Sequence, residues 1–261
     1  MSDPSKRPSV SGAAQRVWAI VPAAGSGDRF GGEKRKQYLP LAGRPVIAWV
    51  LSRLLETPGL AGIAVATAAC DPDFEAMAQS IEPPTAGRLM RVDGGAERAH
   101  SVMAALERLR SLGAPDDPVM VHDAVRPCVS LGDIERVVEA ARNHPSGAVL
   151  AEPVRDTLKR SALPHRKTKS LTRASRIEAT VDRSRLWCAL TPQVFPMDAL
   201  YRAYHRALAA GKEINDEATA MELAGANPLL VRALAPNPKI TWPDDLALCA
   251  ALLQASKTSP S

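Results

Sequence analysis

The sequence predicts a three-layer α/β fold with a mostly parallel central sheet, on three observations. Short apolar runs alternate with segments whose apolar residues recur at helical spacing. The runs are apolar on both faces, as in parallel strands that helices cover on each side. A chain of 261 residues, 46% of them hydrophobic, is large enough to bury such a core as one domain.

The expected elements follow one another in a regular order. Strands are expected at 17–22, 62–67, 88–92, 118–123 and 147–154, and helices at 45–56, 72–80, 97–112 and 131–143. Pro45 suits the first turn of its helix, where a backbone N–H would have no helical partner. The pattern resumes with LWCALTPQVF (186–195) and ends with helices at 196–210, at 216–225 and from Pro243.

Residues 154–183 interrupt this pattern, because they are basic, rich in Ser and Thr, and without helical period. The stretches DTLKR and RIEATV predict an extended hairpin that projects from the sheet. A hairpin is unstable alone in water, so we expect it to pair with its copy in a homodimer. The alternative is a disordered surface loop. The folded domain is expected at 17–254, with flexible tails at 1–16 and 255–261.

Composition and charge narrow the class of protein. The net charge is +5, but aromatic residues make up only 4% and no long polybasic block occurs, so we expect no nucleic-acid partner. No run of 18 apolar residues and no signal-peptide core occur, so we expect no membrane partner and a cytoplasmic location. Four distant cysteines predict buried, reduced thiols.

A glycine loop follows the first strand, the usual place for phosphate in an open α/β sheet. Gly25 and Gly27 fit a dinucleotide fingerprint, but Phe30 occupies its third glycine position. A P-loop match fails as well, because the lysine position holds a glutamate. What remains is a loop with two cations, Arg29 and Lys36, that would neutralise phosphate charge. The alternative is a solvated glycine turn.

Two further clusters are expected at strand ends. Gly94 and Gly95 follow the third strand, and Ser101 lies inside the next helix. Asp123 ends a central strand, where ligands of open sheets bind, and a carboxylate there holds a metal ion or a hydroxyl group. The alternatives are a simple turn for the glycines, and a helix cap or a partner of Arg126 for the carboxylate.

The combination resembles the 2-C-methyl-D-erythritol 4-phosphate cytidylyltransferase family. The matching motifs are PAAGSGDRF, KQYLPLAGRPV, GGAERAHSV, VHDAVRP, VRDTLKR, VDRSRLWCALTPQVF, NDEATAMELAG and NPKITWPDDLAL. They occur in order between Val17 and Leu253, nearly the whole folded chain. The resemblance implies a Rossmann-like nucleotidyltransferase fold and the transfer of CMP from CTP to a polyol phosphate, with Mg²⁺ or another divalent cation.

The resemblance also implies roles for residues that match the motifs. The catalytic cations would be Arg29, Lys36 and Lys239. The nucleotide site would comprise Ala23, Ala24, Gly25, Gly27, Gly95, Ala96, Ser101 and Asp123. The acceptor site would comprise Asp123, Arg126, Thr157, Arg183 and Thr191. The arm at 154–183 would reach the acceptor site of the second subunit. No metal ligand is assigned.

Three positions depart from the family pattern. Arg35 stands where a proline is usual before KQY, Val125 replaces an alanine in HDAARP, and Asn215 stands where Thr is expected before DEA. The arm is also longer than expected, with PHRKTKSLTR as the additional piece.

The chemistry needs cations rather than a covalent nucleophile, because two anions must approach one another. A phosphate monoester is already nucleophilic at neutral pH, so no general base is expected and His122 is interpreted as structural. Two alternatives stay open. One is a cytidylyltransferase for another polyol phosphate, such as ribitol 5-phosphate. The other is a non-catalytic nucleotide- or RNA-binding protein.

Overall fold

A computed structural model describes residues 16–25, 35–81, 87–162 and 176–258, and every structural statement below concerns these residues. Their centre is a seven-stranded sheet with the order β11-β7-β10-β6-β1-β4-β5. Its strands are β1 (Val17–Pro22), β4 (Leu60–Thr67), β5 (Leu89–Asp93), β6 (Pro118–Val121), β7 (Ala148–Pro153), β10 (Trp187–Pro196) and β11 (Leu229–Arg232). Only β10 is antiparallel to its neighbours among these strands. The expected mostly parallel sheet is confirmed.

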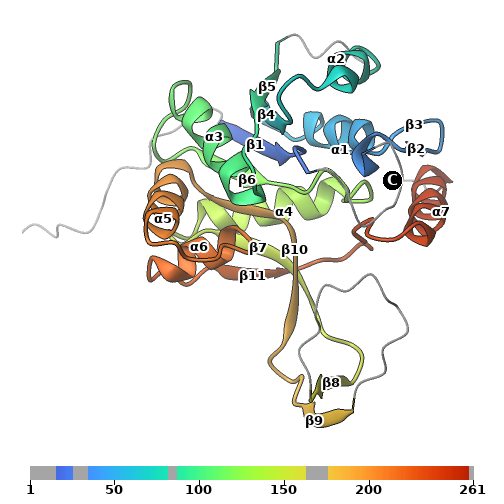
Figure 1. Cartoon of the computed structure of the whole chain (residues 1–261), viewed down its shortest axis with the longest axis vertical. Helices are drawn as coiled ribbons and strands as arrows, with labels where there is room; N and C mark the ends of the chain where they lie inside the picture. The colour runs from blue at the N-terminus through green and yellow to red at the C-terminus, as the bar shows by residue number, and fades with distance from the viewer. Residues whose placement is uncertain (1–15, 26–34, 82–86, 163–175, 259–261) are drawn as a thin grey trace, which may run out of the picture.

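Helices cover both faces of the sheet, which gives three layers (Figure 1). The helices are α1 (Val46–Leu55), α2 (Pro72–Gln79), α3 (Arg98–Arg110), α4 (Leu131–Arg142), α5 (Met197–Ala209), α6 (Glu217–Leu223) and α7 (Asp244–Thr258). One core cluster joins α1, α2 and α4 to the sheet, and another joins α3, α5 and α6 to it. These helices agree closely with the ranges expected from apolar spacing.

Several short elements were not expected from the sequence. They are the edge strand β11, the small hairpin of β2 (Pro40–Leu41) and β3 (Arg44–Pro45), and the 3-10 helix η2 (Lys36–Tyr38). Helix α7 packs near this small hairpin, where Cys249 and Leu253 join Leu41 and Val46 in a third apolar cluster. The small hairpin therefore has a core of its own.

Two expectations need correction. The last helix continues to Thr258, so part of the tail expected at 255–261 is helical. The cysteines were expected to be buried, but Cys70 and Cys188 are exposed, and only Cys249 is fully buried. The number and spacing of the cysteines do not show which face of an element each one occupies, so they could not distinguish exposed thiols from buried ones.

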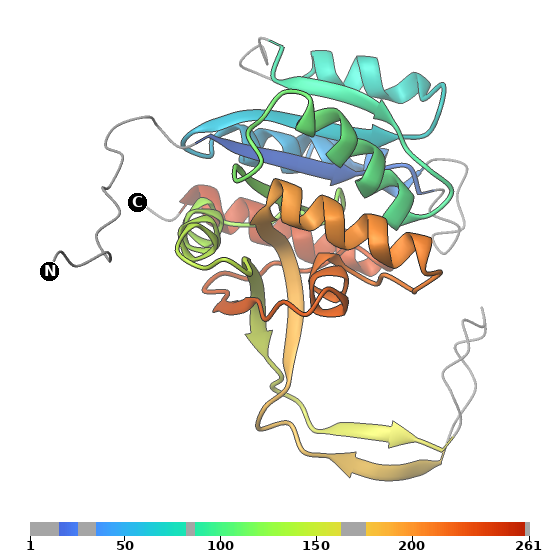
Figure 2. The same ribbon diagram turned by 90° about the vertical axis from the view of Figure 1, so that its left-hand side faces the viewer.

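The expected hairpin arm is present and projects from the body of the molecule (Figures 1 and 2). It consists of β8 (Leu158–Ser161) paired antiparallel with β9 (Ile177–Val181), and residues 163–175 lie outside the described part. The arm extends the antiparallel pair β7 and β10, because Val154 N–H donates to Leu186 O at 3.1 Å beyond the sheet. Ile177 on the arm is 65% exposed.

Within the described residues, none of the helices combines the length and the apolar character that crossing a membrane requires.

Two glycines should respond oppositely to alanine substitution. Gly147 has a φ of +74°, and a Cβ there would lie 2.3 Å from Phe195 Cδ1 and 2.4 Å from Val194 O. Because Phe195 is buried and cannot move away, Gly147→Ala should destabilise the fold by about 3 kcal/mol or more. In α4, a Cβ at Gly132 meets nothing within 4 Å.

The matched variant Gly132→Ala should therefore be neutral or stabilise the protein by up to about 1 kcal/mol, since alanine favours helix. Urea unfolding curves of both variants measure the difference. Equal midpoints for the two variants would contradict this account of Gly147.

Candidate functional site

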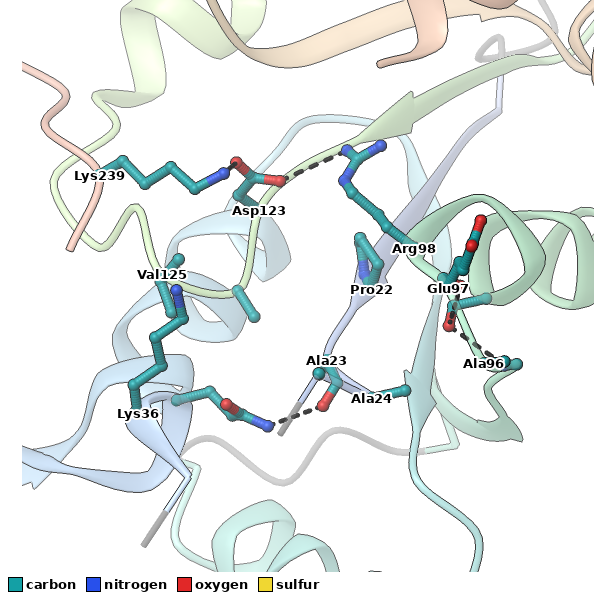
Figure 3. Close-up of a pocket in the computed structure, with 15 residues that line it drawn as sticks. Pro22, Ala23, Ala24, Lys36, Ala96, Glu97, Arg98, Asp123, Val125 and Lys239 are labelled. Atoms are coloured by element: carbon teal, nitrogen blue, oxygen red, sulfur yellow. Dashed lines mark hydrogen bonds and ion pairs between the residues drawn. The ribbon is translucent and has the colours of Figure 1, made fainter. Parts of the chain in front are cut away.

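A cavity of about 460 Å³ opens at the carboxyl ends of β1, β5 and β6 (Figure 3). Its lining comprises Pro22, Ala23, Ala24, Gly25, Lys36, Gln37, Gly95, Ala96, Glu97, Arg98, Ser101, Asp123, Ala124, Val125 and Lys239. A larger hollow of about 700 Å³ lies around Asp117, Asn143 and Pro196, at the amino ends of the strands. Ligands of open α/β sheets bind at the carboxyl ends, so the first cavity is the candidate site.

The glycine pair after β5 shapes one wall of the cavity. A Cβ at Gly94 would lie 2.6 Å from Ala24 Cβ and 2.8 Å from Ser101 Oγ, and a Cβ at Gly95 would lie 2.3 Å from His100 Cβ. Glycine is therefore required where this loop packs against the loop after β1. The Ser101 hydroxyl accepts from Gly95 N–H and donates to Glu97 O, both at 3.2 Å, so it is engaged in holding the loop.

Lys36 reaches the cavity from η2, whose position is fixed from two sides. Gln37 Nε2 donates to Ala23 O at 2.7 Å, which ties η2 to the end of β1. On the other side, Arg35 and Tyr38 both donate to the buried Asp71 Oδ2, at 2.7 and 2.9 Å. Arg35, which departs from the family pattern, thus has a structural partner in Asp71, the residue that caps α2.

Asp123 lies at the centre of the charged groups, directly after β6. Its Oδ2 accepts from Lys239 Nζ at 2.8 Å, and its Oδ1 accepts from Arg98 Nη2 at 3.3 Å. Arg126 Nε lies 3.5 Å from Oδ2. Burial by itself would raise the pKa of Asp123, but the charges of Arg98, Lys239 and Arg126 outweigh it and hold the pKa well below its usual range. The carboxylate is therefore ionised.

The chain after β11 brings Lys239 to Asp123 across a large sequence distance. Arg126 Nη1 donates to Asn237 O at 2.7 Å, and Asn237 Nδ2 donates to Thr191 O at 2.8 Å. The N–H of Ile240 donates to Val125 O at 2.9 Å. Arg126 thus holds the segment that carries Lys239, and it also lies close to Asp123.

His122 is completely buried beneath the site, and its hydrogen bonds define its tautomer. Its Nε2 faces the carbonyl oxygen of Arg126 at 3.1 Å and therefore donates. The neutral ring then accepts at Nδ1 from the Thr191 hydroxyl at 3.0 Å, and that hydroxyl accepts from Asp123 N–H at 3.1 Å. His122 is therefore a structural residue, as interpreted from the sequence, and it holds Thr191 against the backbone of Asp123.

Many of the predicted site residues come together here. Those that line the cavity are Ala23, Ala24, Gly25, Lys36, Gly95, Ala96, Ser101, Asp123 and Lys239. Arg126 and Thr191 lie beneath it. Thr157 and Arg183 are exposed residues of the arm and do not line the cavity of their own chain. Gly27 and Arg29 lie outside the described residues.

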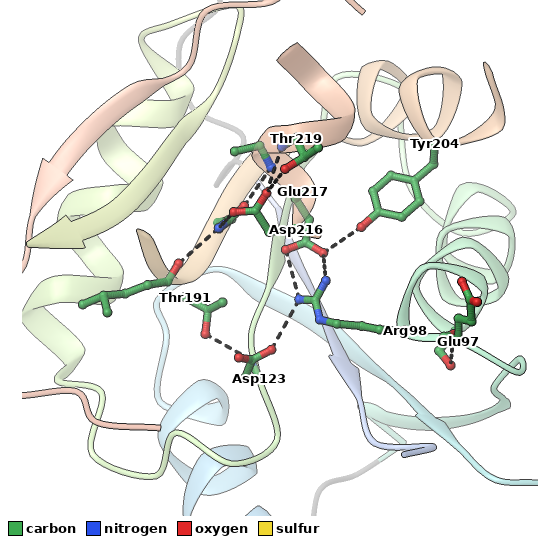
Figure 4. Close-up of polar contacts among 12 residues, drawn as sticks. Glu97, Arg98, Asp123, Thr191, Tyr204, Asp216, Glu217 and Thr219 are labelled. Atoms are coloured by element: carbon green, nitrogen blue, oxygen red, sulfur yellow. Dashed lines mark hydrogen bonds and ion pairs between the residues drawn. The ribbon is translucent and has the colours of Figure 1, made fainter. Parts of the chain in front are cut away.

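Sequence reasoning missed Arg98, Gln37 and Glu217. Arg98 lines the cavity and pairs with both Asp123 and Glu217 (Figure 4). Arg98 and Glu217 each lie inside a quoted motif, GGAERAHSV and NDEATAMELAG, but 119 positions separate them. A buried acid in an otherwise apolar helix face was the available signal, because such a group needs a partner.

The arrangement suits a ligand that carries several negative charges. Three cations, Lys36, Arg98 and Lys239, line the cavity together with two carboxylates, Glu97 and Asp123, of which Asp123 is already paired with Arg98 and Lys239. Among the described residues, no group of three or more His, Cys, Asp or Glu side chains is arranged to hold a metal ion. The three cations favour an anionic ligand.

The buried ring of His122 should make the free energy of unfolding depend on pH. Burial lowers the pKa of His122 from 6.5 to about 4. Between these two pH values, His122 is therefore protonated in the unfolded chain and neutral in the folded chain. This contribution to stability is complete above pH 6.5 and is lost as the pH falls toward 4, by about 3 kcal/mol in total.

Urea unfolding of the wild type and of His122→Gln between pH 7.5 and 4 measures this contribution. Carboxyl groups titrate in both proteins, so the difference between the two slopes isolates the histidine. The wild type should lose more stability than the variant over this range. Parallel curves would contradict the assignment of a neutral His122.

Comparison with known proteins places the chain among homologues of similar length. The profile of a family described as 2-C-methyl-D-erythritol 4-phosphate cytidylyltransferase matches residues 17–255. The protein of that name from Halorhodospira halophila is 47% identical over 94% of this chain and 96% of its own length. The one from Shewanella amazonensis is 46% identical over 92% of this chain and 94% of its own.

Solved structures agree. A crystal structure of 4-diphosphocytidyl-2C-methyl-D-erythritol synthase superposes with a TM-score of 0.74 at 33% identity, over 92% of this chain and 99% of that one. The 2-C-methyl-D-erythritol 4-phosphate cytidylyltransferase of Thermus thermophilus gives a TM-score of 0.69 at 31% identity, over the same shares. With the family profile, the close relatives and the cation-lined cavity in agreement, this chain belongs to the 2-C-methyl-D-erythritol 4-phosphate cytidylyltransferase family.

Proposed function

We propose that this chain transfers CMP from CTP to 2-C-methyl-D-erythritol 4-phosphate and releases pyrophosphate, a step of isoprenoid precursor biosynthesis. The observation that carries the proposal is the cation-lined cavity at the carboxyl edge of the sheet, whose lining residues lie within the range that matches the family profile. Lys36 and Lys239 both lie on the side of the cavity opposite Ala96 and Glu97 (Figure 3).

The reaction is a displacement at the α-phosphorus of CTP. A phosphate oxygen of the acceptor forms the new P–O bond, and the bond to pyrophosphate breaks, so the leaving group carries away the bonding electrons. The barrier comes from the mutual repulsion of two anions and from charge that develops on the phosphorus. Lys36 and Lys239 reduce both by their positive charge, and Arg29 of the glycine loop is proposed to do the same.

The base site is proposed at the Gly94–Ala96 loop. Because the Ser101 hydroxyl is engaged with Gly95 N–H and Glu97 O, it shapes the loop, and the carbonyl oxygen of Gly95 and the backbone groups of Ala96 are proposed to read the cytosine edge. A site that hydrogen-bonds one base rejects another by leaving polar groups unpaired.

A divalent cation such as Mg²⁺ is proposed as cofactor. It would neutralise triphosphate charge and stabilise the leaving pyrophosphate. Asp123 is the carboxylate in the cavity that is held by cations on both oxygens, so the ion would be held chiefly by the triphosphate oxygens. Because both oxygens of Asp123 already have cationic partners, this arrangement fits an ion that enters the cavity bound to the nucleotide.

The proposal includes a homodimer in the cytoplasm. Thr157 and Arg183 match acceptor-site positions of the family but lie on the arm, away from the cavity of their own chain. An arm that pairs with its copy would bring them to the acceptor site of the second subunit, while Lys36, Asp123 and Lys239 act within their own chain. The cysteines within the described residues are free, which agrees with a reducing compartment.

The function is tested by pyrophosphate release from purified protein. CTP with 2-C-methyl-D-erythritol 4-phosphate should support turnover about 10²-fold or more above UTP, ATP or GTP, because the loop reads one base edge. Ribitol 5-phosphate in the same assay tests the rival acceptor. Binding without pyrophosphate release, with a steep dependence on salt, would favour a non-catalytic nucleotide- or RNA-binding protein instead.

The shared site is tested by mixing two inactive proteins. Lys36→Ala should lower turnover by about 10² or more, and Arg183→Ala should do so through the acceptor site. In a mixed dimer, one site carries both defects and the other carries neither. Because half of the dimers are mixed after exchange, about a quarter of wild-type activity should return.

Each variant alone, taken through the same exchange procedure, is the control. Subunit exchange is verified with two differently labelled chains. If exchange is complete and no activity returns, Arg183 serves its own subunit or the arm does not build the site.

A further inference from the structure

A continuous polar chain leads from the interior of the protein into the cavity (Figure 4). The Tyr204 hydroxyl donates to Glu217 Oε1 at 2.9 Å, and both side chains are fully buried. Arg98 donates to Glu217 through Nη1 at 2.7 Å and through Nη2 at 3.2 Å. The same Nη2 reaches Asp123 Oδ1 at 3.3 Å. Among the residues that the structure describes, Glu217 is thus linked by hydrogen bonds to the lining of the cavity through Arg98.

The burial of Glu217 is not explained by packing. Its neighbours on α6, Ala218, Ala220 and Met221, are apolar and belong to the core cluster beneath α5. A buried carboxylate is costly, and an apolar residue of similar size often stabilises a core as well or better. Burial would lower the pKa of Arg98, but the charge of Glu217 outweighs it and raises the pKa above its usual range. Glu217 and Arg98 therefore form an ion pair of fixed geometry and no net charge.

The two oxygens of Asp123 have different partners: Arg98 lies at Oδ1, whereas Lys239 donates to Oδ2 and Arg126 Nε lies 3.5 Å from Oδ2. Arg98 is held by both oxygens of Glu217, so its planar fork has a fixed direction as it approaches Oδ1. Lys239 has Asp123 Oδ2 as its hydrogen-bond partner, and its side chain is 43% exposed on a flexible stem. Of the two, Lys239 is the cation able to turn toward an incoming phosphate.

We infer that Glu217 is a positioning residue: through Arg98 it fixes the carboxylate of Asp123, so that Lys239 is the cation released to the substrate phosphates. The inference rests on the proposed function. Without the charge of Glu217, Arg98 keeps Asp123 as its carboxylate partner and swings onto it. Asp123 then shifts toward α3, while the cavity gains one net positive charge.

The variant Glu217→Gln tests this, because it keeps the size of the side chain and removes the charge. The turnover number kcat should fall by about 10- to 100-fold, the range usual for residues that orient a functional group. The dissociation constant of CTP should stay within about threefold of the wild-type value or fall below it. Calorimetry on the purified, folded protein measures it.

Asp198→Asn is the matched control. Asp198 pairs with Arg110, which lies on helix α3 as Arg98 does, but at the opposite end of that helix. The substitution therefore removes a carboxylate partner of α3 far from the cavity. It should leave kcat and CTP binding unchanged. Arg98→Lys is the second variant, in case Glu217→Gln does not fold. It keeps both charges and loses the planar fork, and its kcat should fall by about 10-fold with CTP binding retained.

The kcat and the CTP dissociation constant of the Glu217→Gln variant decide whether Glu217 is a positioning residue. A fall in kcat with CTP binding retained supports the inference. A kcat within about twofold of wild type, after correction for the folded fraction, overturns it and leaves a purely structural ion pair. Parallel loss of kcat and CTP binding also overturns it, because the cavity itself would then depend on the pair. Wild-type protein without any turnover would instead contradict the proposed function.

Discussion

The negative charge of Asp123 organises the site, because three cations from distant parts of the chain converge on it. Arg98 comes from α3, Arg126 from the loop after β6, and Lys239 from the segment after β11. In a half-buried cavity these attractions are screened less than at the surface. The carboxylate therefore gathers positive charge at the cavity where the substrates are proposed to bind.

Asp123 can act in this way only because its own backbone is fixed. A neutral His122 accepts from Thr191, and Thr191 accepts from the N–H of Asp123. The same strand β10 carries Thr191 O, which accepts from Asn237 and so holds the segment of Lys239. One antiparallel strand thus supports both the anion and its principal cation.

The antiparallel direction of β10 also accounts for the arm. Because β7 and β10 run in opposite directions side by side, their connection can continue as a hairpin beyond the sheet. A parallel pair would have required a crossover that packs back onto a face. The arm is therefore an extension of the central sheet, directed away from the core.

Local periodicity and motifs were enough to predict the layers of the fold, the arm, the family, and the clusters of Gly94 and Asp123 that follow two strands. The strand expected at 118–123 ends at Val121, two residues before Asp123. Which charges meet depended instead on how distant elements pack. Glu217 and Arg98 lie 119 positions apart, and Lys239 lies 116 positions from Asp123, so no local pattern pairs them. The tertiary structure also decided that Ser101 holds its own loop and that Arg35 pairs with Asp71. The physical reason is that periodicity records which face of an element is buried, whereas a charge pair is set by how distant elements pack together.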